Sequence, residues 1–308
     1  METIDLTELT AAVRDAVPQQ SPWRDLAGYV ADRVAQDPAK PFVTWYDDET
    51  GERVELSYAT FANWVWKTAN YVRDGLEVER ADHVVAMLRT HWQTVAVWFG
   101  VWSAGAVLVP VDPGSVERYD AQPAVASFVQ EDRLVLAAAS PELLGEVVGL
   151  SLRPMAARLT TVPPGASDYT VEVPSYGDQL GPGERAMLDD EALPDRTGAR
   201  LVAGAAAAVS RLSLRPADRL LCALPVTDPD VFVATVLAVF HAGAGIVLTR
   251  GTDPGRLWQR AAEERVTVVV ADDGTLTSAG DATAAPAVRL LVTLALGHRG
   301  EPHLQTGH

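Results

Sequence analysis

Positive charge is scarce in this sequence, and almost all of it comes from arginine. The 308 residues include 25 lysines and arginines against 41 aspartates and glutamates, which gives a formal net charge of −16. Only Lys40 and Lys67 are lysines, and no run of basic residues occurs. Nucleic acids and anionic membrane surfaces are bound through clustered basic side chains. We therefore expect no nucleic-acid partner, and no chemistry after residue 67 that needs a lysine amine.

Cysteine is nearly absent as well. The single cysteine, Cys222, cannot form an internal disulfide and stands in an apolar run, so we expect a core residue in a cytoplasmic protein. The acidic segment 1–10 lacks the basic flank and apolar stretch of an ordinary signal peptide. Two apolar stretches, 95–111 and 231–249, are each interrupted by an Ala-Gly pair. This indicates buried α/β core and no membrane span.

What the sequence does contain is an internal repeat. Each copy has an Ala-Asp turn with a short apolar strand, an apolar helix that ends at Ala-Gly, a second apolar strand, and Asp-Pro-Gly. In the first copy, the first strand is expected within 81–88, the helix at 94–103, the second strand at 106–111 and Asp-Pro-Gly at 112–114. In the second copy, the same elements are expected within 217–224 and at 231–241, 245–249 and 253–255. Glycine closes a helix in the left-handed conformation, and Asp-Pro starts the next helix. This alternation predicts an α/β fold of two similar subdomains, with mainly parallel sheets covered by helices.

The expected organisation has two subdomains joined by a linker. The boundaries are 1–161 for the first subdomain, 162–200 for the linker, 201–297 for the second subdomain and 298–308 for a frayed tail. The first subdomain is expected to open with a strand at 41–46, a hairpin and a helix from Ser57. The linker is rich in proline, glycine and acidic residues, and is expected to hold at most one short strand, at 169–173.

Several segments, in this order, resemble the adenylate-forming superfamily of acyl-CoA synthetases, luciferases and peptide-synthetase adenylation domains. They are Pro41-Phe42-Val43, Leu56-Ser57-Tyr58, the strand at Val84, Ala104 to Pro113, Pro216 to Pro225, Gly243 to Leu248 and Glu263 to Val270. The resemblance covers roughly residues 22–276. It implies the large N-terminal domain of that superfamily, which consists of two similar α/β subdomains.

The resemblance also implies where adenylation chemistry should lie. Members join a carboxylate to the α-phosphate of ATP, which needs hydrogen-bond donors, positive charge and a divalent metal at the phosphates. A Ser/Thr/Gly-rich loop ending in Pro-Lys-Gly is implied just before the helix near Leu201. The segment 193–200 has no lysine, and Asp195 would repel phosphate. Thr197 and Gly198 are a possible remnant of the loop, and a plain polar entry to the helix is the alternative.

Other features implied by the superfamily are missing. Asp228 and Asp230 follow Leu224-Pro225, where members have an aromatic residue or histidine, and we expect these aspartates to cap a helix. The Tyr-Gly-x-Thr-Glu segment, the Gly-Asp ribose contact and the C-terminal domain with its catalytic lysine have no match before the sequence ends at His308. No nucleophile elbow, zinc motif or dinucleotide fingerprint occurs either. We therefore predict no catalytic residue and no metal ligand.

Three functions remain open. The first is a non-catalytic member that acts in binding, scaffolding or regulation, with an unknown protein or a small acyl or aryl ligand as its partner and with no cofactor. The second is acyl or aryl adenylation with ATP and Mg, completed by a partner chain, for which Arg196 and Arg200 are the nearby cations. The third is a nucleotide-independent acyl-binding module that keeps the pocket between the subdomains.

Overall fold

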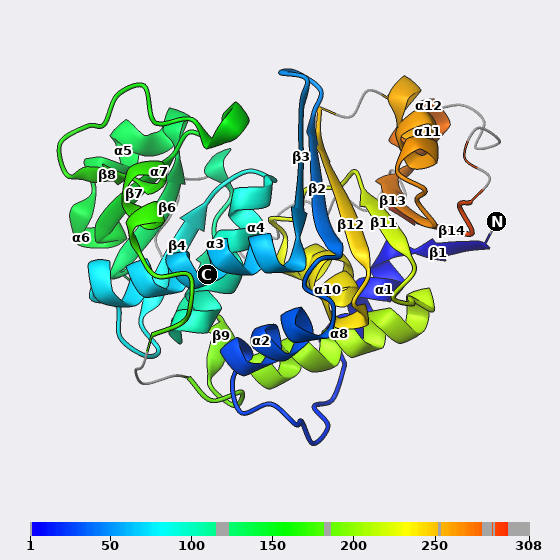
Figure 1. Ribbon diagram of the computed structural model, residues 1–308, viewed down its shortest axis with the longest axis horizontal. Helices are drawn as coiled ribbons and strands as arrows, with labels where there is room; N and C mark the ends of the chain where they lie inside the picture. Colours follow the sequence, from blue (N-terminus) through cyan, green and yellow to red (C-terminus); the bar gives the residue numbers. More distant parts are fainter. Residues whose placement is uncertain are drawn as a thin grey trace, which may run out of the picture.

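Two mainly parallel β-sheets lie side by side, and helices pack between them and over their outer faces (Figure 1). The structure is a computed structural model that describes residues 2–114, 123–181, 186–251, 254–278, 285 and 287–294. It confirms the predicted α/β fold with mainly parallel sheets. The predicted tail at 298–308 and most of the helix predicted after Asp112 lie outside the described residues.

The first sheet is built from short apolar strands of the first half of the chain. These are β4 (His83–Met87), β5 (Val107–Pro110), β6 (Ala126–Gln130), β7 (Glu146–Leu150) and β8 (Ala166–Asp168). Within the described residues they are all parallel, in the order β5-β4-β6-β7-β8. Their nearly continuous apolar sequences fit strands that are covered on both faces.

Two helices of this half, at 58–70 and 92–104, lie where the sequence predicts them. They are α3 (Tyr58–Asn70), the π-helical turn η1 (Tyr71–Gly75), α4 (Trp92–Ala104), η3 (Glu131–Arg133), α5 (Leu134–Ala138), α6 (Pro141–Leu144), η4 (Pro154–Ala156), α7 (Tyr169–Glu172) and η5 (Val173–Ser175). Ser57 caps α3, because its Oγ accepts a hydrogen bond from the Thr60 amide at 3.1 Å. Gly105 ends α4 in the left-handed region, at φ 95°.

The second sheet combines strands from both ends of the chain. They are β1 (Glu2–Asp5), β2 (Pro41–Asp47), β3 (Glu52–Ser57), β11 (Arg219–Cys222), β12 (Gly245–Arg250), β13 (Val268–Asp272) and β14 (Leu290–Leu294). In the described part of the chain their order is β1-β14-β13-β11-β12-β2-β3, and every neighbouring pair is parallel except β2 and β3.

Helices cover this second sheet as well. They are α1 (Leu6–Arg14), α2 (Leu26–Gln36), α8 (Gly198–Leu212), α9 (Pro229–Phe232), the π-helical η6 (Val233–Leu237), α10 (Ala238–Ala242), α11 (Pro254–Glu263) and α12 (Asp273–Ser278). Gly243 follows α10 in the left-handed conformation, at φ 67°. A small antiparallel hairpin, β9 (Glu191–Leu193) and β10 (Arg196–Thr197), leads into α8.

The hairpin β2–β3 joins the second sheet, although the sequence grouped it with the first half. β2 runs parallel to β12, with Val43 opposite Ile246 and Trp45 opposite Leu248. The edge of β12 would otherwise leave a row of backbone groups unpaired, and β2 satisfies them. The two sheets therefore do not divide the chain at residue 161.

The segment 162–200 contains more regular structure than the sequence indicates. The strand predicted at 169–173 is wrong, because Tyr169–Glu172 forms α7. Asp168 starts this helix, since its carboxylate accepts a hydrogen bond from the Thr170 amide at 2.9 Å. Tyr169 is buried, and its hydroxyl lies 2.7 Å from Thr68 Oγ1. The segment is thereby packed against α3.

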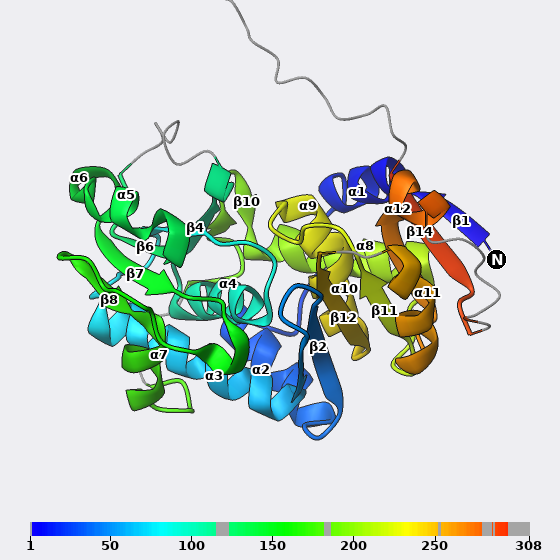
Figure 2. The same cartoon turned by 90° about the horizontal axis from the view of Figure 1, so that it is seen from above.

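The two halves share one hydrophobic core. α3 and α4 lie between the sheets (Figures 1 and 2), and every residue of α4 is buried. Trp98 of α4 stacks on Phe232 of α9 with ring centroids 4.1 Å apart, and Phe99 lies 4.9 Å from Phe240 of α10. A single cluster of buried side chains includes residues of both sheets. Among the described residues, no helix has the length and hydrophobicity to cross a membrane.

Candidate functional site

The predicted phosphate-loop position is occupied by the β9–β10 hairpin. Its strands are joined by Pro194 and Asp195 alone, and Asp195 has a positive φ of 62°. Thr197, the end of β10, is the N-cap of α8, and Gly198 is the first residue of that helix. At the two candidate residues the backbone therefore forms the capped start of a helix.

The first amides of α8 are already hydrogen-bonded within the chain. The Gly198 amide donates to the Asp190 carbonyl at 3.0 Å, and the Ala199 amide to the Leu188 carbonyl at 2.6 Å. The Arg200 amide donates to Thr197 Oγ1 at 3.3 Å. A helix start binds an anion through amides that have no other partner. All three of these amides have partners within the chain.

The charged side chains near the start of α8 also form ion pairs with one another. Arg196 Nη1 lies 2.6 Å from Asp230 Oδ1, and Arg14 Nη1 lies 2.7 Å from Asp230 Oδ2. Asp228 caps α9, as predicted, by accepting from the Asp230 and Val231 amides. Asp230 instead bridges the two arginines. Arg200 is exposed and is the cation nearest to the helix start that does not take part in this cluster.

Both lysines have structural partners. Lys40 Nζ donates to the Gly243 carbonyl at 2.6 Å and also to the Pro216 carbonyl. Lys67 Nζ donates to the Tyr176 carbonyl at 2.6 Å. Among the described residues, no three His, Cys, Asp or Glu side chains come together as a metal site.

A cleft of about 480 Å³ lies where the carboxyl ends of both sheets meet. In open parallel sheets this edge is the usual place for a ligand, near the strands where the chain order reverses. Residues that follow β4, β5, β6, β11 and β12 form its walls, and we call it the inter-sheet cleft. It is lined by Arg89, Thr90, Asp112, Pro113, Gly114, Gln130, Arg133, Ala223, Leu224, Pro225, Thr227, Thr249, Arg250 and Gly251.

Three arginines give the inter-sheet cleft its polar character. Arg89 donates from Nη2 to the Leu152 carbonyl at 2.8 Å, whereas its buried Nε has no described partner. Burial, followed by the neighbouring charge of Arg250, lowers the pKa of Arg89. Arg250 is paired with Asp47 at 3.2 Å. Arg133 is the least engaged, because its Nε lies 3.9 Å from Asp132 and donates no hydrogen bond within the described residues.

The inter-sheet cleft also contains a carboxylate and a contact between the two halves. Asp112 accepts a hydrogen bond from the Gly114 amide at 2.9 Å. Thr90 Oγ1, after β4, accepts from the Val226 amide, after β11, at 3.0 Å. The cleft therefore offers arginine donors to a small anion, between walls that are hydrogen-bonded to each other.

The cleft arginines were not identified from the sequence. The available signal was their position, because Arg89 follows the first strand of one repeat copy and Arg250 ends the second strand of the other. Carboxyl ends of parallel strands gather at one edge of a sheet, so these positions are candidates for any α/β fold. What the sequence did not show is that the two sheets turn these edges toward the same cleft.

The sequence and the architecture are both similar to those of known proteins. The AMP-binding enzyme family matches residues 30–125. A TIGR03089 family protein of Mycobacterium tuberculosis is 38% identical over 249 residues, which are 80% of this chain and 98% of that protein. The N-terminal domain of FACL13 from M. tuberculosis superposes with a TM-score of 0.68 at 18% identity, over 88% of this chain and 70% of that one. Brucella canis acyl-CoA synthetase superposes with a TM-score of 0.73 at 16% identity, over 94% of this chain and 55% of that enzyme.

The fold is that of the N-terminal domain of adenylate-forming enzymes. The chain belongs to the family of the mycobacterial TIGR03089 protein, and its residues 30–125 match the AMP-binding enzyme family.

Proposed function

We propose that this protein binds a ligand or partner without adenylating a carboxylate. The observation that carries the proposal is the start of α8, where the amides of residues 198–200 are bonded to the chain itself. The pairing of Arg196 with Asp230 supports it, because it neutralises the cation closest to the expected phosphate position. Losing one electrostatic contact at such a site costs about 10²–10³ in rate. Without a loop lysine and without free amides at the start of α8, this position lacks the donors that the resemblance implies for the phosphates.

ATP–pyrophosphate exchange tests this proposal. With Mg and a panel of alkyl and aryl carboxylic acids, we expect exchange at the level of a reaction without protein, while an active acyl-CoA synthetase gives a strong signal under the same conditions. ATP with Mg is also expected to leave the melting temperature unchanged, because a ligand stabilises only a fold that binds it. Saturable exchange with any acid would overturn the proposal. Repeating the assay with a separately added C-terminal domain of an acyl-CoA synthetase tests whether a partner chain completes the enzyme.

A second candidate function is nucleotide-independent binding of an acyl or aryl carboxylate in the inter-sheet cleft. The observation that favours it is that two buried arginine Nε groups of the cleft, on Arg89 and Arg133, have no hydrogen-bond partner among the described residues. Buried donors of this kind are usually satisfied, and a carboxylate is the partner that a guanidinium accepts best. The apolar side chains of Leu224 and Pro225 line the same cleft and suit a hydrocarbon group.

We expect Arg133→Gln to weaken the binding of such a carboxylate by about 10–100-fold, which corresponds to the loss of one charged hydrogen bond. Arg133 is chosen because its side chain is 43% exposed and its one ion pair is long, so its removal should leave the fold intact. Isothermal titration calorimetry with a carboxylate found in a thermal-shift screen gives the affinity. Arg211→Gln is the control, since Arg211 lies at the end of α8 and pairs with Glu8. Equal affinities in both variants would exclude the cleft as the binding site.

A further inference from the structure

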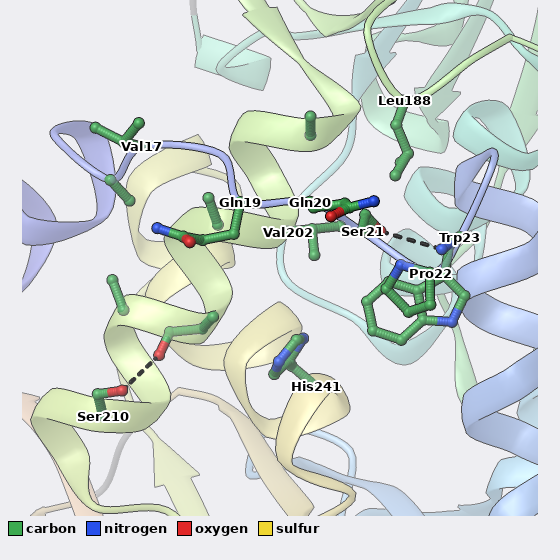
Figure 3. A pocket seen from close by; sticks show the side chains of 15 residues that line it. Val17, Gln19, Gln20, Ser21, Pro22, Trp23, Leu188, Val202, Ser210 and His241 are labelled. Carbon is green, nitrogen blue, oxygen red and sulfur yellow. Dashed lines mark hydrogen bonds between the residues drawn. The ribbon is translucent and has the colours of Figure 1, made fainter.

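A second cavity, of about 400 Å³, lies beside α8 and shares no lining residue with the inter-sheet cleft. Small side chains of α8, among them Ala203 and Ala207, form one side of it (Figure 3). The segment 16–23 and His241 of α10 form the other sides. We call this cavity the α8 pocket. Its volume lies within the range of about 300–1,000 Å³ that is typical of small-molecule sites.

The α8 pocket is uncharged in a strongly charged protein. None of the described residues that line it is Asp, Glu, Lys or Arg, although the chain carries a net charge of −16. Burial, with a smaller contribution from Arg33, lowers the pKa of His241, so this imidazole is neutral at pH 7. The pocket therefore lacks a partner for a charged ligand and suits an uncharged one.

Ring contacts hold the walls of the pocket in place. Trp23 packs edge-to-face on Tyr29 with ring centroids 4.8 Å apart. Its Nε1 donates to Asp32 at 3.2 Å, and its backbone amide donates to Ser21 Oγ at 3.1 Å. These contacts fix the indole next to the Ala-lined side of α8 before any ligand binds. A preformed wall of this kind lowers the ordering cost of binding.

His241 supplies a polar group inside the α8 pocket. It projects toward the space between Trp23 and α8 (Figure 3). Its Nδ1 lies 3.3 Å from the Tyr29 hydroxyl, whereas its Nε2 has no protein partner in the described part of the chain. At the rim, the side chain of Val17 is 73% exposed. A bound molecule with an apolar body and one polar group could cover Val17 and hydrogen-bond to Nε2.

We propose that the α8 pocket binds an uncharged aromatic molecule that carries one hydrogen-bonding group. Its rings lie between Trp23 and the alanines of α8, and its polar group contacts His241 Nε2. This site is independent of the nucleotide and carboxylate positions discussed above, and it does not rest on the proposed function.

Fluorescence titration with 1-N-phenylnaphthylamine tests the site. This probe is uncharged at neutral pH and emits strongly only in apolar surroundings. We expect saturable binding of one probe per chain, weakened at least about 10-fold by Ala203→Phe and by Ala207→Phe, which place a phenyl group in the pocket. Ala262→Phe is the matched control, because Ala262 is exposed on α11 and lies outside the pocket. The Ala262→Phe variant should bind the probe with the same affinity as the unmodified protein.

Competition experiments test the role of His241. 2-Naphthol should displace the probe about 2–10-fold more effectively than naphthalene, the difference expected for one neutral hydrogen bond. His241→Phe should abolish this difference and keep probe binding. Circular dichroism identifies any variant that does not fold. If one of the two pocket-filling variants fails to fold, the probe affinity of the other still tests the site. Absence of saturable binding, or binding that survives in both folded pocket-filling variants, would overturn the proposal.

Discussion

Replacing Trp98 by alanine is expected to lower the free energy of unfolding by about 3–5 kcal/mol. Trp98 is 1% exposed and stacks on Phe232 with an interplanar angle of 15°. It also packs against Trp102 in the same helix. Alanine would remove these ring contacts and leave a cavity in the middle of the shared core, where α4 cannot move to fill it. Urea unfolding followed by circular dichroism measures the change.

Trp98→Phe is the matched variant, and it should lose less than half as much stability because it retains a ring against Phe232. The shared core also predicts that both halves unfold in one transition. Fluorescence and circular dichroism should therefore give the same midpoint. A loss below about 1 kcal/mol for Trp98→Ala would show that the contact between the halves is not tightly packed.

Replacing Glu264 by alanine is expected to cost about 2–4 kcal/mol. The carboxylate is 6% exposed and lies 2.9 Å from both Arg53 of β3 and Arg219 of β11. It also accepts a hydrogen bond from the Tyr46 hydroxyl at 2.5 Å. Its loss would leave two arginines to share Glu55. The expected cost lies below that of a fully buried ion pair, because Arg53 is 45% exposed.

Glu263→Ala is the control for this prediction. Glu263 is the neighbouring residue and is exposed, and its one side-chain hydrogen bond in the described part of the chain comes from Gln259, one turn earlier on α11. Its removal should change stability by no more than about 0.5 kcal/mol. If thermal unfolding shows equal effects for the two variants, the cluster around Glu264 does not contribute to the attachment of the β2–β3 hairpin.

The parts of the fold that depend on local chemistry could be predicted from the sequence. The strand at 41–46 is signalled by its aromatic and β-branched residues, and the helix after Ser57 by helical periodicity and a capping hydroxyl, all within a few residues. Gly105 and Gly243 mark helix ends for the same reason, since only glycine enters the left-handed region without strain. The α7 helix is the exception, because its capping residue, Asp168, is followed by the β-branched residues Thr170 and Val171, which favour a strand.

The arrangement of these elements in space was harder to predict. The pairing of β2 with β12 joins residues about 200 positions apart, and nothing within either strand specifies the partner. The same limit applies to the sites. The sequence shows that no lysine follows Lys67, but it does not show that carbonyls of residues 188 and 190 occupy the start of α8. The inter-sheet cleft and the α8 pocket each gather residues from several distant segments, so neither has a sequence motif.

Engineering a phosphate site at the start of α8 would need two separate changes. Lysine at position 200 would supply an amine in the first turn of the helix, where the first amides are still bonded to the chain. Freeing those amides requires the carbonyls of residues 188 and 190, which precede β9, to move away from the helix. A new cation and a different backbone path before β9 are therefore both needed.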